Sequence, residues 1–139
     1  FSQISDEVDI IVIVVPIPFV ASLIESIVPY VSPNTVFVNC SKGIDNTTLY
    51  TVSDILKMSL NIPYAYSVFS GGMIAAELIA GAPLGATIGI SDITISSRLH
   101  QLFSNPDVSI SFSTHYKNIE LFGALKNIFA IHSGYLEGR

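Results

Sequence analysis

Five short apolar runs, spaced roughly 20 to 30 residues apart, constrain the fold of this chain more than any other feature. Each run is followed by Pro or Ser, and most are rich in β-branched residues, which is typical of β-strands. The first run reads DIIVIVV without polar alternation, and such continuity is typical of a strand that is covered on both faces. The runs predict strands at residues 9–15, 35–40, 64–69, 84–90 and 108–112.

The segments between the runs predict helices, so that strands and helices alternate along the chain. Apolar spacing and turn residues place these helices at residues 19–28, 49–60, 73–80, 92–103 and from 114 onward. Helical crossovers between short apolar strands predict an α/β fold with a doubly wound sheet, and ligands of such sheets bind beyond the carboxyl ends of the strands. Those ends are predicted at Pro16, Ser41-Lys42, Ser70-Gly71, Ser91 and Thr114. A second domain is expected to begin between residues 113 and 117.

The composition argues against several classes of partner. The chain has 139 residues, is 50% hydrophobic and carries a net charge of -5, with six Lys and Arg residues that form no basic stripe. We therefore expect no nucleic-acid partner. The longest early stretch without a charge, Ile10–Ile24, is short and contains two prolines, so no membrane span is predicted. A single cysteine, Cys40, forms no disulfide within the chain, which favours a cytoplasmic location, with an organellar matrix as the other compartment considered.

Lys126 and Asn127 lie in an otherwise apolar helix, residues 120–134. At about 100° per residue, the apolar side chains occupy most of the circumference, so the helix is expected to be buried nearly all round. Lys126 must then either extend its stem to reach water, or occupy an enclosed polar site where desolvation makes an amine a usable proton donor and acceptor. The residues alone leave both interpretations open.

The remaining candidate groups give weaker indications. His100, His115 and His132 have no carboxylate or cysteine at ligand spacing, so no metal site is predicted. Lys42 alone is interpreted equally well as an exposed turn residue. Cys40 is interpreted as a small buried residue, although the charge of Lys42 nearby would make it sensitive to alkylation. Neither a GxGxxG fingerprint nor a Walker A loop occurs in the chain.

Four segments, taken together, carry a family resemblance. VVPIPF, CSKGID, SGGMIAAE and ELFGALKN occur in the order and at the intervals of the NAD(P)-dependent glycerol-3-phosphate dehydrogenases, and the chain resembles that family along essentially its whole length. The resemblance implies an excerpt of a parent protein that has a Rossmann domain followed by an all-helical substrate domain. Residues 1–114 would be the later part of the Rossmann-like domain, and residues 115–139 the first helix of the helical domain. It also implies NAD or NADP as cofactor, dihydroxyacetone phosphate and sn-glycerol 3-phosphate as substrates, and a homodimer as the assembly to consider.

The resemblance also implies roles for individual residues. Lys126 is similar to the catalytic lysine of the family, which exchanges a proton with the substrate oxygen as hydride passes between nicotinamide and the carbonyl carbon. The substrate-binding residues that it implies are Lys42, Lys126, Asn127 and Gly71. The cofactor-binding residues that it implies are Phe19, Lys42 and Ala75.

The sequence departs from the family pattern at Met73 and Pro18, where polar residues are usual, so no substrate contact is carried over to Met73. Two other hypotheses stay open. One is a related dehydrogenase of a hydroxy acid with the same architecture, and the other is a catalytically silent domain for binding or assembly. The isolated chain is expected to be inactive, because the dinucleotide fingerprint is not in it.

Overall fold

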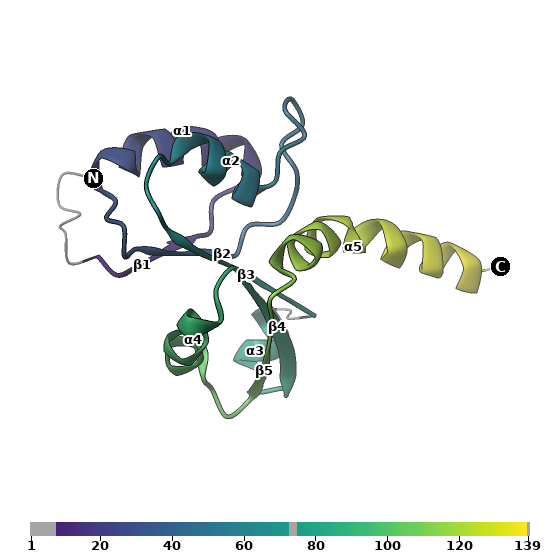
Figure 1. Cartoon of the computed structure of the whole chain (residues 1–139). Helices are drawn as coiled ribbons and strands as arrows, with labels where there is room; N and C mark the ends of the chain where they lie inside the picture. Colours follow the sequence, from purple (N-terminus) through teal and green to yellow (C-terminus); the bar gives the residue numbers. More distant parts are fainter. Residues whose placement is uncertain (1–7, 73–74, 139) are drawn as a thin grey trace.

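The computed structural model of the chain describes residues 8–72 and 75–138, and its centre is a five-stranded sheet in the order β1-β2-β3-β4-β5 (Figure 1). The strands are β1 (Ile10–Ile13), β2 (Val36–Asn39), β3 (Ala65–Gly71), β4 (Leu84–Ile90) and β5 (Val108–Ser113). The helices are α1 (Val20–Ile27), α2 (Val52–Ser59), α3 (Ala75–Ile79), α4 (Ser96–Phe103) and α5 (Tyr116–Glu137), with short 3₁₀ turns η1 (Ile17–Phe19), η2 (Val28–Tyr30) and η3 (Ile93–Ile95). This alternation of strands and helices confirms the predicted α/β class.

Capping residues explain where two of the helices begin. α2 begins three residues later than predicted, because Thr51 and Asp54 form a reciprocal capping box. The Thr51 hydroxyl accepts a hydrogen bond from the Asp54 N–H at 3.4 Å, and the Asp54 carboxylate accepts one from the Thr51 N–H at 3.2 Å. Asp92 caps η3 through the Thr94 N–H at 2.8 Å, and α4 follows. The helix predicted at residues 73–80 corresponds to α3, and positions 73 and 74 lie outside the described residues.

The strands do not all run in one direction. β1, β2 and β3 are parallel, β4 is antiparallel to β3, and β5 is parallel to β4. The helix between β3 and β4, α3, is about 7.5 Å long, whereas β4 spans about 23 Å, so α3 is no full-length helical crossover and β4 runs back alongside β3. The five predicted carboxyl ends therefore do not form one ligand site, because Ser91 and Thr114 lie at the opposite edge of the sheet from Pro16, Ser41 and Gly71.

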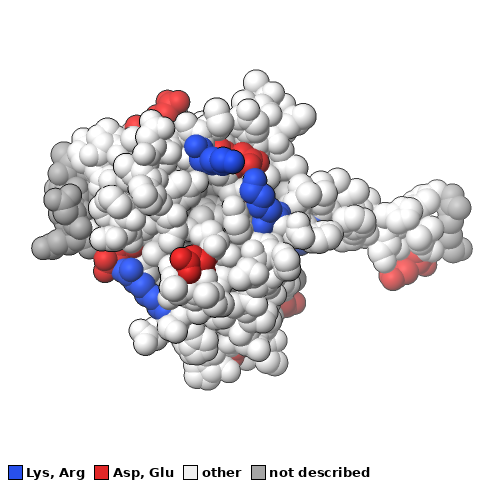
Figure 2. Space-filling model, in the orientation of Figure 1, with Lys and Arg blue, Asp and Glu red and all other residues white. Residues whose placement is uncertain are grey.

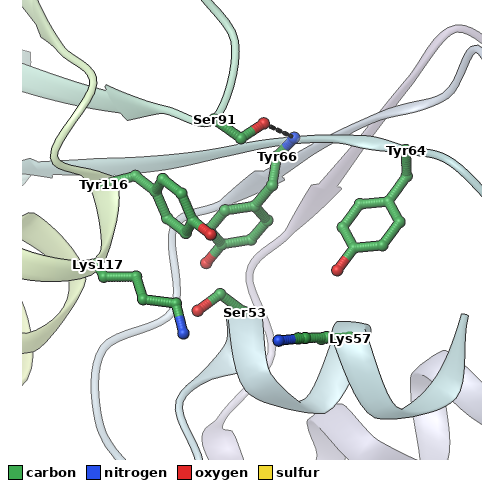
Figure 3. Close-up of a pocket in the computed structure, with 7 residues that line it drawn as sticks. All are labelled: Ser53, Lys57, Tyr64, Tyr66, Ser91, Tyr116 and Lys117. Carbon is green, nitrogen blue, oxygen red and sulfur yellow. Dashed lines mark hydrogen bonds between the residues drawn. The ribbon is translucent and has the colours of Figure 1, made fainter.

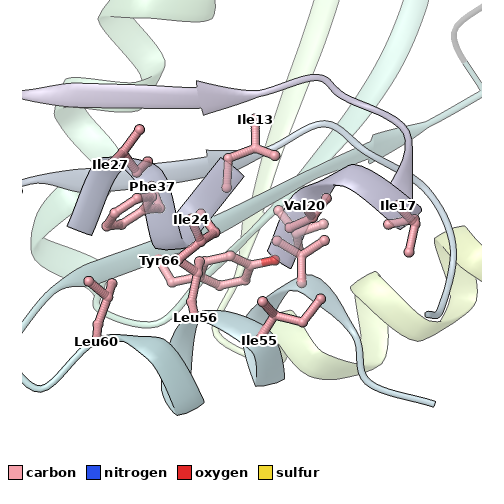
Figure 4. Close-up of a cluster of buried hydrophobic side chains, with 12 residues drawn as sticks. Ile13, Ile17, Val20, Ile24, Ile27, Phe37, Ile55, Leu56, Leu60 and Tyr66 are labelled. Carbon is pink, nitrogen blue, oxygen red and sulfur yellow. The ribbon is translucent and has the colours of Figure 1, made fainter. Parts of the chain in front are cut away.

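Two apolar clusters lie on opposite faces of the sheet. Because successive side chains of a strand point to opposite faces, Phe37 of β2 packs with α1 and α2, whereas Val36 and Val38 pack with Leu99 of α4. The cluster beneath α1 and α2 is shown in Figure 4. Its buried members are Ile13, Ile17, Val20, Ile24, Ile27, Phe37, Val52, Ile55, Leu56, Leu60, Tyr66 and Val68. Both faces are thus covered around β2. The prediction that residues 9–15 form a strand covered on both faces is wrong in this chain, because β1 lies at the edge of the sheet and 43% of Val12 is exposed.

The long helix α5 is buried only along part of its first half. Among its described residues Glu120 and Gly123 are buried, and this half packs on β3 and β4. Beyond Lys126 the helix extends away from the sheet (Figure 1), and apolar side chains such as Ile131 are exposed. The prediction that this helix is buried nearly all round is therefore wrong in this chain, because 22 helical residues span about 33 Å and outrun the strands beneath them.

Two glycines allow α5 to approach the sheet closely. A Cβ atom at Gly89 of β4 would lie 2.7 Å from the Tyr116 Cα atom. A Cβ atom at Gly123 of α5 would lie 3.1 Å from the Ser70 hydroxyl oxygen. The first distance is below any ordinary contact and the second is tight, so a larger residue at Gly89 would push the helix away from the sheet.

Candidate active site

Two lysines from distant parts of the sequence meet at one edge of the sheet. Lys42 lies in the segment after β2, and Lys126 comes from α5 where the helix passes the end of β3. The Lys126 ammonium donates a hydrogen bond to the Gly71 carbonyl at 3.1 Å. Partial burial lowers the pKa of Lys42, and the neighbouring charge of Lys126 lowers that pKa further. The structure thus brings together three of the predicted site residues: Lys42, Lys126 and Gly71. We call Lys42 and Lys126 the lysine pair.

Lys126 is less buried than the prediction of a helix buried nearly all round implies. Its side chain is half-buried, and Lys42 is more exposed although partly shielded from water, so the pair lies at an open edge. The ammonium group of Lys126 is held by a backbone carbonyl, as in a polar site, but it lies at an open edge near water. The structure therefore lies between the two interpretations of Lys126, a stem that reaches water and an enclosed polar site. A cavity of about 220 Å³ adjoins Gly71. It is lined by Ser70, Gly71, Thr87, Ile119 and Phe122.

The other predicted site residues come from neighbouring segments. Phe19 ends η1, which follows β1 at the same edge of the sheet, and 61% of it is exposed. Asn127 follows Lys126 on α5 and is exposed. Ala75 begins α3, four residues after Gly71, whereas Met73 lies outside the described residues. The predicted residues therefore belong to α5 and to the segments that follow β1, β2 and β3.

Hydrogen bonds fix the turn that follows β2. The Ser41 N–H donates to the Asn39 side-chain oxygen at 2.8 Å, and the Ser41 hydroxyl donates to the Val15 carbonyl at 2.6 Å. Gly43 has a φ of 136° and approaches η1 so closely that a Cβ atom would lie 2.9 Å from Ile17 Cγ1. The turn after β2 is therefore joined to the segment after β1.

Cys40 lies at the start of this turn and is half-buried. Burial raises the pKa of its thiol, and the charge of Lys42 lowers that pKa by less. The predicted sensitivity to alkylation is therefore wrong in direction, because desolvation outweighs the neighbouring charge.

Glu120 is a buried acidic residue for which the sequence predicts no role. Only 5% of it is exposed, and its Oε1 atom accepts three hydrogen bonds. The donors are the Asn39 side-chain amide at 3.1 Å, the Ser53 N–H at 3.1 Å and the Tyr66 hydroxyl at 2.6 Å. Its Oε2 atom has no hydrogen-bond partner among the described residues. Burial raises the pKa of Tyr66, and the charge of Glu120 raises that pKa further. The only signal in the sequence is a single carboxylate on the sheet-facing side of an apolar helix.

A cavity of about 300 Å³ adjoins two of the partners of Glu120 (Figure 3). Its lining residues are Ser53, Lys57, Tyr64, Tyr66, Ser91, Tyr116 and Lys117. Figure 3 shows the Tyr66 ring between the rings of Tyr64 and Tyr116. Neither member of the lysine pair lines this cavity, so it is separate from the predicted site.

Charged groups on the surface are few. Figure 2 shows, on one face, a small number of basic side chains with acidic ones beside them. The ion pairs include Arg98–Asp9 at 2.7 Å and Lys117–Asp54 at 3.1 Å. Within residues 8–72 and 75–138, no group of three or more His, Cys, Asp or Glu side chains is arranged to hold a metal ion. No helix in that part of the chain is long and apolar enough to cross a membrane.

The fold and the position of the lysine pair define a Rossmann-like α/β domain with a polar site at the carboxyl ends of its parallel strands. Residues 1–96 match the family described as the N-terminus of NAD-dependent glycerol-3-phosphate dehydrogenase. The chain therefore belongs to the NAD-dependent glycerol-3-phosphate dehydrogenase family, which confirms the predicted family.

Known relatives agree with this assignment. The chain is 35% identical over 125 residues to chloroplastic glycerol-3-phosphate dehydrogenase [NAD(+)] of Oryza sativa subsp. japonica, covering 89% of this chain and 28% of the relative. It is 34% identical over 131 residues to glycerol-3-phosphate dehydrogenase [NAD(P)+] of Nitratidesulfovibrio vulgaris (strain DP4), covering 94% of this chain and 40% of the relative. The solved glycerol-3-phosphate dehydrogenase of Plasmodium falciparum has a TM-score of 0.82 at 26% identity, over 96% of this chain and 38% of that chain. The chain thus spans 28% to 40% of the length of these relatives.

Proposed function

We propose that the full-length protein interconverts dihydroxyacetone phosphate and sn-glycerol 3-phosphate, with NAD or NADP as the hydride carrier. The observation that carries this proposal is the meeting of Lys42 and Lys126 beside the Gly71 carbonyl, in a chain of this family. Two positive charges at one point suit a phosphorylated substrate, which is close to a dianion at neutral pH. A simple hydroxy acid carries one negative charge, so the lysine pair favours this substrate over those of related hydroxy-acid dehydrogenases.

Lys126 is the catalytic residue in the proposed reaction. Its ammonium is held at the edge of the sheet by the Gly71 carbonyl, and it can turn toward a bound ketone. Negative charge develops on the carbonyl oxygen during reduction, so a nearby ammonium stabilises the transition state more than the ground state and can deliver its proton. Lys42 adds a second charge that attracts the substrate phosphate, and the exposed Asn127 and the Gly71 backbone would orient the substrate.

Phe19, Lys42 and Ala75 are proposed to contact the dinucleotide, which supplies the hydride when it is bound. Phe19 is large and apolar, yet it is mostly exposed at the edge where α/β sheets bind ligands. An aromatic ring in that place fits a planar group of the cofactor, and the ammonium of Lys42 fits a phosphate. These residues would hold only part of the cofactor, because no GxGxxG loop occurs in residues 1–139.

We also propose the division of the chain into residues 1–114, the later part of a Rossmann-like domain, and residues 115–139, the first helix of an all-helical substrate domain. The exposed apolar side chains on the second half of α5 support this division, because such a surface is normally covered. A cytoplasmic location is proposed as well, with an organellar matrix as the alternative, since the rice relative is named chloroplastic.

The test of this function is an assay of the full-length protein for oxidation of NADH or NADPH by dihydroxyacetone phosphate. Replacing Lys126 with Met should lower kcat by about 10² to 10⁴-fold, which is the usual contribution of a general acid. Lys57→Met removes an exposed lysine from α2 and is the matched control, with kcat expected to stay within about twofold. Normal turnover by the Lys126→Met variant would contradict the proposal, and so would equal activity with unphosphorylated dihydroxyacetone.

A further inference from the structure

Two buried side chains, Asn39 and Glu120, connect the elements that carry the two lysines. We propose that Asn39 and Glu120 are positioning residues that set the spacing between Lys42 and Lys126. The spacing is a property of the folded chain, and only its effect on turnover rests on the proposed function. The contacts of the two residues run from the helix that carries one lysine to the turn that carries the other.

Glu120 ties α5 to three other elements. Its Oε1 atom receives donors from β2, from β3 and from the first turn of α2, and only 5% of the residue is exposed. Because these donors belong to different elements, the carboxylate restrains both the rotation of α5 about its axis and its sliding along the sheet. Lys126 lies six residues further along the same helix, which is about 9 Å. A shift of the helix at Glu120 is therefore transmitted to the Lys126 ammonium.

Asn39 ties the same carboxylate to the turn that carries Lys42. It is the last residue of β2 and is 1% exposed. Its Nδ2 atom donates to Glu120 Oε1 at 3.1 Å, while its Oδ1 atom accepts from the Ser41 N–H at 2.8 Å. Lys42 is the next residue. An amide is the side chain that can donate to a carboxylate with one atom and accept from a backbone N–H with the other. Asn39 thus contacts both the carboxylate of the helix that carries Lys126 and the turn that carries Lys42.

Close packing prevents the surroundings from compensating for a loss of these contacts. The Tyr116 backbone lies against Gly89, and Gly123 lies against Ser70, so the first half of α5 cannot move toward the sheet. A missing hydrogen bond at Glu120 would instead let the helix rotate or slide outward. The Lys126 ammonium would then leave the Gly71 carbonyl and move away from Lys42.

The test uses Asn39→Leu in the full-length protein, because this substitution keeps the shape and adds no charge while it removes both hydrogen bonds. Glu120→Asp is a second variant, which keeps the charge but withdraws the carboxylate by one methylene group. Ser67→Ala is the matched control, since Ser67 is fully buried on β3 and its hydroxyl donates to the Phe37 carbonyl at 3.3 Å, away from Glu120. Circular dichroism establishes that each variant is folded.

The first readout is the titration of Lys42, followed by NMR in protein labelled with ¹³C at the lysine Cε atoms. Lys42→Arg assigns the signal. Burial lowers the pKa of Lys42, and the charge of Lys126 lowers it further; if Lys126 moves away, this repulsion weakens and the midpoint should rise above the wild-type value in both variants. The control should keep the wild-type midpoint. This readout needs no substrate, so it does not depend on the proposed function.

The second readout is turnover with dihydroxyacetone phosphate. A displacement near 1 Å can cost about 10²-fold in rate, so kcat should fall by at least about tenfold in Asn39→Leu and Glu120→Asp. The KM for dihydroxyacetone phosphate should change less than about threefold, because charge attraction weakens only slowly with distance. Glu120→Gln retains the accepting oxygen and should keep kcat within about threefold of wild type.

An unchanged Lys42 midpoint in a folded Asn39→Leu or Glu120→Asp variant overturns the proposal, as does an equal shift in Ser67→Ala. If the midpoint shifts as expected but the wild-type protein does not turn over dihydroxyacetone phosphate, the positioning role stands and the proposed function fails. If the wild-type protein is active and the midpoint shifts without any loss of kcat, the claim that spacing matters for turnover is overturned.

Discussion

Burial raises the pKa of the Cys40 thiol and the charge of Lys42 lowers it, and the effect of burial is the larger. The thiolate is the nucleophile in alkylation, so a raised pKa lowers its fraction at neutral pH. We expect iodoacetamide to modify Cys40 at pH 7 more slowly than free cysteine, whose pKa is about 8.5, with the rate still rising as the pH passes that value. Mass spectrometry of the alkylated peptide measures the rate. Protein unfolded in urea provides the control and should react like free cysteine. A rate in the folded protein equal to that of free cysteine at pH 7 would refute this expectation.

At the scale of secondary-structure elements, the distance between α5 and β4 decides where Lys126 lies. Gly89→Ala would place a methyl group 2.7 Å from the Tyr116 Cα atom, so the helix must move or the strand must distort. Overpacking of this kind costs about 1–3 kcal/mol, and we expect that loss in urea unfolding together with a lower kcat. Gly85→Ala on the same strand is the matched control, because no atom lies within 4 Å of its added methyl group. Equal stability of the two variants would show that the close approach does not constrain α5.

Local sequence signals predicted the positions of the helices and strands, but not the contacts between distant elements. Short apolar runs and the cap at Asp92 are local signals, and they located the strands and the start of η3 and α4 well. The direction of β4 could not be predicted, because the apolar run of a strand looks the same whether it pairs parallel or antiparallel with β3. The partners of Glu120 lie 54 to 81 residues away in sequence, so no local pattern reports them. Lys126 is conspicuous in the sequence as a lysine in an otherwise apolar helix, but Lys42 resembles an ordinary turn residue, and only the family resemblance links the two.

At the scale of the whole molecule, this chain holds the lysine pair but not the glycine fingerprint that binds a pyrophosphate. We expect residues 1–139 alone to show no binding of NADH in the micromolar range by isothermal titration calorimetry, and the full-length protein to bind it. Phe19 and Lys42 would contribute too little contact to hold the cofactor by themselves. A micromolar dissociation constant for the isolated chain would show that the residues present here are sufficient.

A double-mutant cycle on the lysine pair in the full-length protein tests directly whether Lys42 and Lys126 form a single site. We propose that Lys42 and Lys126 act on one substrate at one point, so their contributions to kcat/KM for dihydroxyacetone phosphate must be coupled. Lys42→Met, Lys126→Met and the double variant should deviate from additivity by about 1 kcal/mol or more, with the double variant only slightly worse than Lys126→Met. Effects that add within about 0.3 kcal/mol would show that the two lysines act independently, and that they do not form a single site.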